Sequence, residues 1–237
     1  MEYKRVLLKL SGEALKNGKD DIVDFDYVLK LCNEISKLNK KFISIGIVVG
    51  GGNIWRGREN TYIDSESSDR IGILGTSINA LILKSAFDKL KINACVYNSF
   101  DAKNIIDKVP SKEKLSILNK ENIIIFGGGT GKVGCSTDTA AALYANLIDA
   151  DVIIKLTNVD GIYNMDPNKY TNAKKYDNIS FDEVIDKNLS VMDLSAIKIC
   201  RDNNIEILVT NINSLFNVED AISKKSYSIV KNKWVIF

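Results

Sequence analysis

The feature that most constrains the fold is an alternation of short runs rich in β-branched residues with longer segments of helical period. This pattern is typical of βαβ units, in which helices cover both faces of a mostly parallel sheet. Several of the short runs are apolar throughout, as expected for strands that are buried on both faces. Strands are expected at Arg5–Leu10, Phe42–Val49, Ala94–Tyr97, Asn122–Phe126, Val152–Leu156 and Glu206–Thr210. The sequence therefore predicts an α/β fold.

The helical segments show recognisable start signals. Ser180, with Glu183 three residues later, has the form of a capping box, and Asp24 is a candidate cap for a helix that begins at Phe25. Helices are expected at Phe25–Asn39, Asp69–Leu90, Thr137–Ile148, Phe181–Lys187 and Ser195–Asn203. The apolar residues of the second of these could pack on a partner chain, but we expect them to cover the protein's own sheet. They are Leu74, Ile78, Leu81, Ile82 and Phe87.

The remainder of the chain favours one domain. The runs Tyr227–Val230 and Trp234–Phe237 predict a terminal hairpin that closes one edge of the sheet. No internal repeat, low-complexity tract or Pro/Ser-rich linker interrupts the 237 residues. A single domain over residues 1–237 is the simplest prediction.

The composition excludes several kinds of chemistry. The chain has no His, so serine-histidine triads, HExxH metal sites and imidazole bases cannot occur. Its four Cys lie far apart without a CxxC pair, which argues against a zinc site or a dithiol centre. We expect all four to be buried: Cys32, Cys95, Cys135 and Cys200.

Charge and hydropathy bear on partners and location. A net charge of +2 gives no argument for nucleic acid or an acidic membrane as a partner. The N-terminal apolar run is too short for a signal peptide, and no run approaches the ~18 apolar residues of a spanning helix. We therefore expect a cytoplasmic protein.

Glycine-rich loops follow three of the expected strands. They are Lys9-Leu10-Ser11-Gly12, Gly50-Gly51-Gly52-Asn53 with Arg56-Gly57, and Gly127-Gly128-Gly129-Thr130-Gly131 with Ser136-Thr137-Asp138. Loops at the carboxyl ends of parallel strands converge, and glycine amides and helix N-termini bind anions. Each loop alone could be a tight turn, but together they predict a site for more than one phosphate, with Lys9 and Arg56 as countercharges. There is no GxxxxGK[ST], nor a GxGxxG with a following acid, which disfavours P-loop enzymes and nicotinamide dehydrogenases.

Five motifs in order resemble the bacterial uridylate kinases of the amino acid kinase superfamily. They are Lys4–Leu15, Val48–Gly57, Asp69–Leu74, Val159–Tyr163 with Asp166-Pro167, and Val191–Ala196. The resemblance implies a three-layer αβα sandwich and ATP-dependent phosphorylation of UMP to UDP with Mg²⁺, in pyrimidine nucleotide biosynthesis. It also implies a homohexamer, with GTP as activator and UTP as inhibitor. No residue is assigned as a metal ligand.

The resemblance also assigns site residues. Lys9 would stabilise the transferred phosphoryl group, and Asp138 and Asp193 would be acidic organisers, although either acid could simply cap a helix. The ATP-binding residues would be Lys9, Leu10, Ser11, Gly12, Gly52, Arg56, Lys155, Thr157, Tyr163 and Asp166. The UMP-binding residues would be Gly51, Asp69, Thr130, Gly131, Lys132, Val133, Gly134, Cys135, Ser136 and Thr137.

One segment departs from the family pattern. The acceptor loop of the family usually carries Asn-Pro and two aromatic residues, whereas this chain has Lys132-Val133-Gly134-Cys135. The change removes flat apolar contacts to a pyrimidine and loosens the loop, which bears on acceptor affinity and base discrimination. Two alternatives stay open: a carboxylate or carbamate kinase of the superfamily, and a nucleotide-binding storage or regulatory protein of the same fold.

Overall fold

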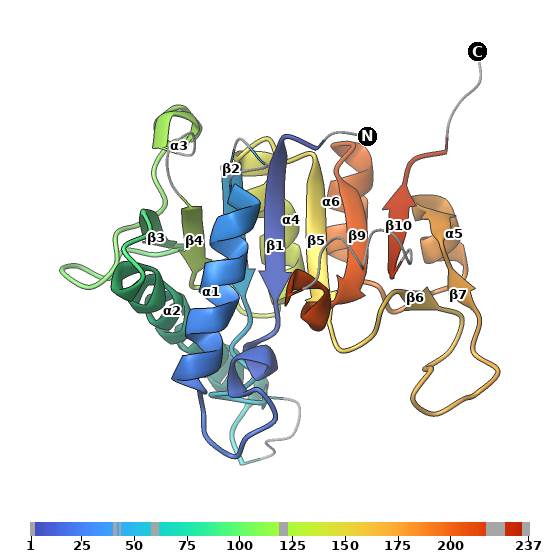
Figure 1. Cartoon of the computed structure of the whole chain (residues 1–237), viewed down its shortest axis with the longest axis horizontal. Helices are drawn as coiled ribbons and strands as arrows, with labels where there is room; N and C mark the ends of the chain where they lie inside the picture. Colours follow the sequence, from blue (N-terminus) through green and yellow to red (C-terminus); the bar gives the residue numbers. More distant parts are fainter. Residues whose placement is uncertain are drawn as a thin grey trace.

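The computed structural model describes residues 3–39, 42, 44–57, 62–118, 123–216 and 226–233. An eight-stranded sheet, in the order β3-β4-β2-β1-β5-β9-β10-β8, lies at its centre (Figure 1). Neighbouring strands from β3 to β9 are parallel, whereas β10 is antiparallel to β9 and parallel to β8. The strands are β1 (Arg5–Leu10), β2 (Ser44–Val49), β3 (Ala94–Asn98), β4 (Ile123–Gly127), β5 (Val152–Thr157), β8 (Asn178–Ser180), β9 (Glu206–Asn211) and β10 (Tyr227–Lys231). A separate hairpin pairs β6 (Ile162–Tyr163) with β7 (Lys175–Tyr176).

Helices cover both faces of the sheet, which confirms the three-layer αβα architecture (Figure 1). One layer contains α1 (Phe25–Asn39) and α2 (Ser65–Lys89), and the other contains α4 (Thr137–Leu147), α5 (Phe181–Asp186) and α6 (Leu194–Asp202). A short helix, α3 (Lys112–Leu118), precedes β4, and two 3₁₀ turns, η1 (Gly12–Lys16) and η3 (Ile212–Phe216), follow β1 and β9.

The pleat of β1 divides its side chains between two apolar cores. Val6, Leu8 and Leu10 belong to the core under α1 and α2, and Leu7 belongs to the core under α4 and α6; all four are fully buried. Each such side chain contributes roughly 1.5–3 kcal/mol by burial. Because successive strand residues point to opposite faces, Lys9 shares the face of Leu7 and points toward the α4 layer.

Most predicted elements are confirmed to within a few residues. The Ser180–Glu183 capping box is present, and Asp24 accepts a hydrogen bond of 3.2 Å from the Tyr27 amide at the start of α1. Helix α2 begins at Ser65 rather than Asp69 because Asp64 caps it, accepting from the Ser67 amide at 2.8 Å. Strand β2 begins at Ser44 rather than Phe42.

Other elements were missed or cannot be compared. The short strands β6 to β8 and helix α3 were not expected from the sequence. Strand β10 pairs with β9 and β8, while Asn122 and the second arm of the expected hairpin, Trp234–Phe237, lie outside the described residues.

Helix α2 combines a buried face with an exposed apolar stripe. Ala80, Leu83 and Phe87 are fully buried, but Leu74 is 53% exposed and Ile78 is 47% exposed. The expectation that Leu74 and Ile78 cover the protein's own sheet was therefore wrong, because they lie on the face of the helix turned away from it. In the described part of the chain, α2 is also the one helix whose length and hydropathy would let it span a membrane, a property shared by core helices of globular proteins.

Candidate active site

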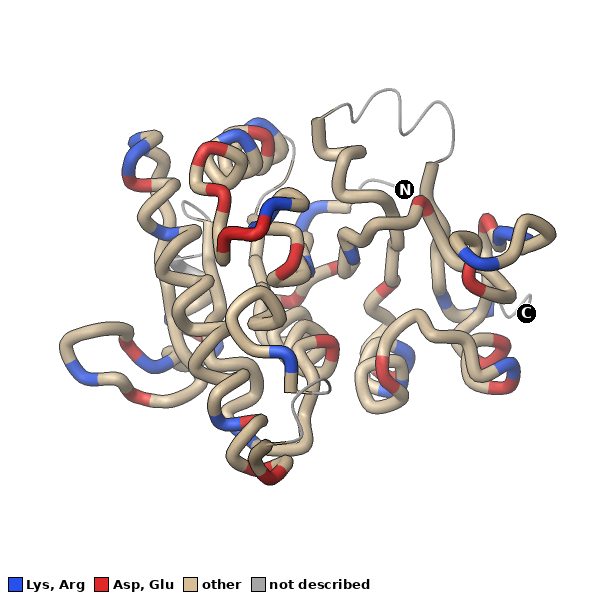
Figure 2. The backbone as a smooth tube through the Cα atoms, turned by 90° about the horizontal axis from the view of Figure 1, so that it is seen from below, with Lys and Arg blue, Asp and Glu red and all other residues tan. Residues whose placement is uncertain are grey.

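The candidate site lies at the carboxyl edge of the sheet, which Figure 2 shows from below. The chain leaves β1 for β2 on one side, whereas β5, on the other side of β1, leads to β9. Ligands of open parallel sheets bind in the crevice at such a switch point. The residues at the ends of β1 and β5 are therefore the first place to examine.

Two lysines and one aspartate form the centre of this edge. Lys9 of β1 and Lys155 of β5 are register partners on adjacent parallel strands, so their side chains lie on the same face. Asp138, in the first turn of α4, bridges them: Oδ1 is 2.6 Å from Lys9 Nζ and Oδ2 is 2.9 Å from Lys155 Nζ. Lys155 Nζ also donates to the Val191 carbonyl at 2.6 Å. The sequence reasoning placed Asp138 as organiser of Lys9, and the two side chains are in contact.

Burial and charge oppose each other within this cluster. Burial alone would raise the pKa of Asp138, but the charges of Lys9 and Lys155 outweigh it and hold the pKa below its ordinary value. Burial lowers the pKa of Lys155, and Asp138 opposes that shift in part. Asp138 is therefore held as an ionised counterion for both ammonium groups.

Asp193 organises the start of α4. Ser136 caps α4 by accepting from the Asp138 amide at 2.9 Å, and its hydroxyl donates to the Asp193 carboxylate. Thr139 donates its hydroxyl to Asp193 at 2.9 Å, and Asp193 in turn caps α6 by accepting from the Ala196 amide. Asp193 therefore caps one helix and contacts the turn that carries Asp138.

The first two glycine loops are in direct contact. The Gly50 amide donates to the Leu10 carbonyl at 2.9 Å. A Cβ at Gly12 would lie 2.4 Å from Asn53 Oδ1 and 2.7 Å from the Gly50 carbonyl oxygen, so this position requires glycine. Ser11 caps η1 by accepting from the Ala14 amide, and the buried Leu10 offers only its backbone to a ligand.

Arg56 is held by an acid in this structure. Its Nε lies 3.1 Å from Glu13 Oε1, and its Nη2 lies 2.7 Å from Glu13 Oε2, while the side chain is 49% exposed. The sequence expectation made Arg56 a phosphate ligand without naming Glu13. An oxygen anion entering between the first two loops would compete with this carboxylate for the same guanidinium group.

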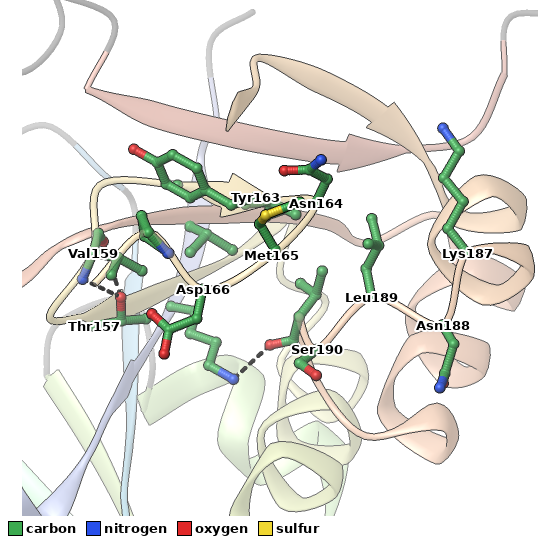
Figure 3. A pocket seen from close by; sticks show the side chains of 16 residues that line it. Thr157, Val159, Tyr163, Asn164, Met165, Asp166, Lys187, Asn188, Leu189 and Ser190 are labelled. Atoms are coloured by element: carbon green, nitrogen blue, oxygen red, sulfur yellow. Dashed lines mark hydrogen bonds between the residues drawn. The ribbon is translucent and has the colours of Figure 1, made fainter. Parts of the chain in front are cut away.

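A cavity of about 610 Å³ lies beyond the end of β5 (Figure 3). Four of the expected ATP-binding residues line it, namely Lys155, Thr157, Tyr163 and Asp166. Figure 3 shows Thr157, Tyr163 and Asp166 on one side and the segment Lys187–Ser190 on the other. This second wall was missed from the sequence, because a polar loop after a short helix gives no motif.

Two residues of this cavity have internal partners. The Tyr163 hydroxyl donates to Asp160 at 2.7 Å, and this bond raises the pKa of Tyr163 to about 12. Asp166 accepts from the Asn168 amide at 2.9 Å. Tyr163 thus offers a neutral aromatic ring, and Asp166 keeps an oxygen for further donors.

A smaller cavity of about 160 Å³ lies on the other side of the lysine pair. Its lining includes Gly51, Gly52, Asp69, Cys135 and Thr137, all of them expected from the sequence. Thr137 directly precedes Asp138, so this cavity and the larger one flank the charged cluster. The sequence missed Trp55 and Thr76 in the lining: Trp55 lies in a motif but was given no role, and Thr76 lies outside the five motifs.

Two hydrogen bonds stabilise the acceptor loop. Asp69 Oδ2 accepts from the Gly134 amide at 2.6 Å, and the Thr130 hydroxyl accepts from the Lys132 amide at 3.2 Å. Four glycines of this region have positive φ, as tight loops require: Gly128, Gly129, Gly131 and Gly134.

A third cavity, of about 600 Å³, adjoins the acceptor loop. Gly131, Lys132 and Val133 line it from the loop, and Arg70, Ile73, Leu74 and Phe100 line it from outside the loop. Ile73 lines both this cavity and the smaller one. Phe100, which no motif marked, supplies an aromatic side chain beside a loop that has lost its own.

The cysteines divide into two groups. Cys32 and Cys200 are buried as expected, and burial raises the pKa of each thiol to about 12. Cys95 is only partly buried and Cys135 is exposed. The expectation that all four are buried was therefore wrong, because Cys135 lies in a surface loop.

The acidic groups of the site do not form a metal cage. Within the described ranges, no group of three or more His, Cys, Asp or Glu side chains could hold a metal ion. Asp138 and Asp193 are already engaged with lysines, hydroxyls and a backbone amide. Mg²⁺ commonly binds through one or two carboxylates together with substrate phosphates, so these residues fit a metal carried by a nucleotide better than one held by protein alone.

Known proteins resemble the chain over almost its whole length. The model of the amino acid kinase family matches residues 4–211. The structure of a UMP kinase from Ureaplasma parvum is 35% identical with a TM-score of 0.89, covering 98% of this chain and 100% of that one. A UMP kinase from Bacillus anthracis is 30% identical with a TM-score of 0.90, covering 99% and 98%. A uridylate kinase from Archaeoglobus fulgidus is 29% identical with a TM-score of 0.68, covering 95% and 99%. On these grounds the chain belongs to the amino acid kinase family, with UMP kinases as its structural relatives.

Proposed function

We propose that the chain is a UMP kinase, which transfers the γ-phosphoryl group of ATP directly to the phosphate of UMP and releases ADP and UDP. The observation that carries this proposal is the lysine pair bridged by Asp138 between two cavities. Lys155 lines the larger cavity, Thr137 lines the smaller one, and Asp138 contacts both lysines. A donor and an acceptor nucleotide bound in the two cavities would meet at this cluster.

Lys9 is the proposed catalytic cation. Its ammonium group has three N–H donors, and one points to Asp138, which leaves others for the oxygens of a phosphoryl group in transfer. Phosphoryl transfer relies on positioning and on neutralising charge at those oxygens. The attacking group is already an anionic phosphate, so the reaction needs no histidine base.

Lys155 and the two acids have supporting roles in this proposal. Lys155 is fixed by Asp138 and by the Val191 carbonyl and would neutralise charge on the donor side. Asp138 would hold both lysines, and Asp193 would hold the turn that carries Asp138.

The donor is assigned to the larger cavity and the first two loops. Gly12 and Gly52 would offer backbone amides to the phosphates, together with Leu10 and Ser11, and Arg56 would exchange Glu13 for a phosphate. Thr157, Tyr163 and Asp166 would contact adenosine, with the ring of Tyr163 as an apolar face and Asp166 as an acceptor for ribose hydroxyls. Mg²⁺ bound to the ATP phosphates would neutralise their charge.

The acceptor is assigned to the smaller cavity and the segment from Thr130 to Thr137. Gly51 and Thr137 would contact the phosphate of UMP, and Asp69 the ribose. The pyrimidine would lie along the acceptor loop, where Phe100 and Val133 supply the apolar contacts that the family obtains from its aromatic pair.

Assembly, regulation and location follow the family in this proposal. We expect a single domain that forms a homohexamer, with GTP as activator and UTP as inhibitor. The exposed apolar residues Leu74 and Ile78 on α2 support an association between copies. Lys/Arg and Asp/Glu positions are interspersed along the backbone drawn in Figure 2, which supports an enzyme without a nucleic-acid partner. We also expect a cytoplasmic location without a membrane partner.

A coupled assay of ADP release tests the proposal. The wild-type chain should turn over with ATP and UMP, less with CMP and not with glutamate. Turnover with glutamate would favour the carboxylate kinase alternative, and no turnover with any acceptor would favour a binding protein. Lys9→Met should abolish UDP formation, whereas Lys37→Met, at an exposed lysine of α1, should leave it unchanged.

A further inference from the structure

Two buried asparagines lie beside the glycine loops without a role in the assignments above. Asn53 follows the glycines after β2 and is 9% exposed, and Asn79 lies on α2 and is fully buried. Asn79 Nδ2 donates to Asn53 Oδ1 at 2.7 Å, and Asn53 Nδ2 donates to Asn79 Oδ1 at 3.1 Å. The two amides therefore form a reciprocal pair between a loop and a helix.

The remaining N–H donors of this asparagine pair bind two backbone carbonyls, one in the loop of Asn53 itself and one in the segment before α1. Asn79 Nδ2 donates to the Gly50 carbonyl at 2.7 Å, and Asn53 Nδ2 donates to the Ile22 carbonyl at 2.9 Å. All four amide N–H groups are thus used. A Cβ at Gly12 would lie 2.4 Å from Asn53 Oδ1, so the first glycine loop packs directly on the pair.

This arrangement joins the donor side of the site to the acceptor side. Gly12 belongs to the loop assigned to the ATP phosphates, and Gly50 directly precedes Gly51, which is assigned to the phosphate of UMP. Buried amides carry a desolvation cost that an apolar pair of similar volume would avoid. The amides instead supply directional hydrogen bonds, and each bond to a backbone carbonyl fixes the position of one backbone segment.

We infer that Asn53 and Asn79 are positioning residues for phosphoryl transfer, which hold the loop of Gly12 and the loop of Gly50 and Gly51 at the separation that in-line attack needs. The inference rests on the proposed function. A displacement of about 1 Å at a reacting centre can cost roughly 10²-fold in rate. Loosening the pair should therefore lower kcat more than it raises either KM.

Asn79→Asp is the sharpest test, because it keeps the shape of the side chain and removes the N–H donors to Gly50 and Asn53. We expect kcat to fall about 10- to 100-fold, while KM for ATP and for UMP changes less than about threefold. The matched control is Asn203→Asp, which makes the same replacement at an exposed asparagine that donates to the Ile199 carbonyl within α6. This control should leave kcat and both KM values unchanged.

A second variant separates positioning from general stability. Asn53→Ala should give a similar fall in kcat, and the double variant should lose no more than the worse single variant, since the two residues act as a unit. If Asn79→Asp does not fold, Asn53→Ala alone must show the kcat loss without a comparable KM change. Folded variants with wild-type kcat, or a fall confined to KM, would overturn the inference alone; a wild-type chain inactive toward UMP would overturn the proposed function with it.

Discussion

Replacing Asp138 by Asn removes the counterion of two lysines at once. The side chains of Lys9, Asp138 and Lys155 are only 11%, 16% and 17% exposed. Removing one partner of a buried ion pair typically costs about 3–5 kcal/mol, because the remaining charge is left without compensation. A domain of ordinary stability has about 5–15 kcal/mol in total, so the variant should remain folded but be clearly less stable.

The difference in unfolding free energy between wild type and Asp138→Asn should depend on pH, and so should the unfolding free energy of the variant itself. The pKa of Asp138 is held below its ordinary value, so its stabilisation is complete above about pH 4 and is lost as the pH falls through the folded pKa. The difference in unfolding free energy between wild type and Asp138→Asn should therefore become smaller in acid. In the variant, the pKa of Lys155 should fall further, because burial lowers it and Asp138 no longer opposes the shift. The folded variant then releases this proton at a lower pH than the unfolded chain does, so its unfolding free energy should rise as the pH rises through the folded pKa toward the ordinary lysine value of about 10.4.

Urea unfolding across this pH range, combined with the coupled kinase assay, measures both effects. We expect kcat of Asp138→Asn to fall by about 10²–10³, since Lys9 loses the group that aims it. Adding Lys155→Met should recover much of the stability but none of the rate, because it removes one stranded charge without repositioning Lys9. Equal unfolding free energies for wild type and Asp138→Asn at neutral pH would refute the reasoning about the charged cluster. An unchanged rate would refute the role of the carboxylate as organiser.

Three further substitutions test the loops. Gly12→Ala would bring a Cβ within 2.7 Å of the Gly50 carbonyl oxygen, so the two loops must separate. In the kinase assay, kcat should fall roughly 10²-fold. A fully active variant would show that the contact can relax. Glu13→Gln should weaken the competition between Glu13 and phosphate for Arg56. KM for ATP should then fall by roughly two- to fivefold, the value of a partly exposed ion pair. An unchanged KM would argue against a contact between Arg56 and the donor. Asp69→Asn weakens the charge-assisted hydrogen bond that holds the acceptor loop. KM for UMP should therefore rise about tenfold while KM for ATP stays constant. Equal changes in both KM values would contradict the assignment of Asp69 to the acceptor side.

The fold was predictable where one face of each element meets a buried layer. Apolar runs predicted β1 and β5, and the change to helical period predicted α1 and α4. Both patterns are informative because hydrophobic burial dominates them. The strands β6 to β8 were missed because two or three residues carry no periodicity. The exposure of Leu74 and Ile78 was missed for a different reason: a helix that is apolar on more than one side does not reveal which side faces the sheet.

The site was predictable to the extent that glycine and charge mark it locally. The family resemblance suggested that Asp138 organises Lys9, and the two side chains are in contact. The contact is possible because a lysine at the end of a strand and an acid at the start of a helix both lie at the same edge of a parallel sheet. The partners that lie far away in sequence were not visible. The ion pair of Glu13 with Arg56 and the hydrogen-bonded pair Asn53–Asn79 join separate loops and helices. Side chains of these types also occur throughout the chain without a role, so residue type alone does not mark them.

The proposed reaction does not need a histidine, because this edge of the sheet supplies fixed cations. Register places Lys9 beside Lys155, and two adjacent ammonium groups in a half-buried crevice repel each other unless an anion is fixed between them. The first turn of α4 supplies that anion as Asp138, at a helix N-terminus that itself favours negative charge. The resulting cluster presents N–H donors at a fixed place. Transfer of a phosphoryl group to an already anionic phosphate needs such fixed donors and no proton shuttle, so the proposed reaction can use the donors that strand register and one helix start place here.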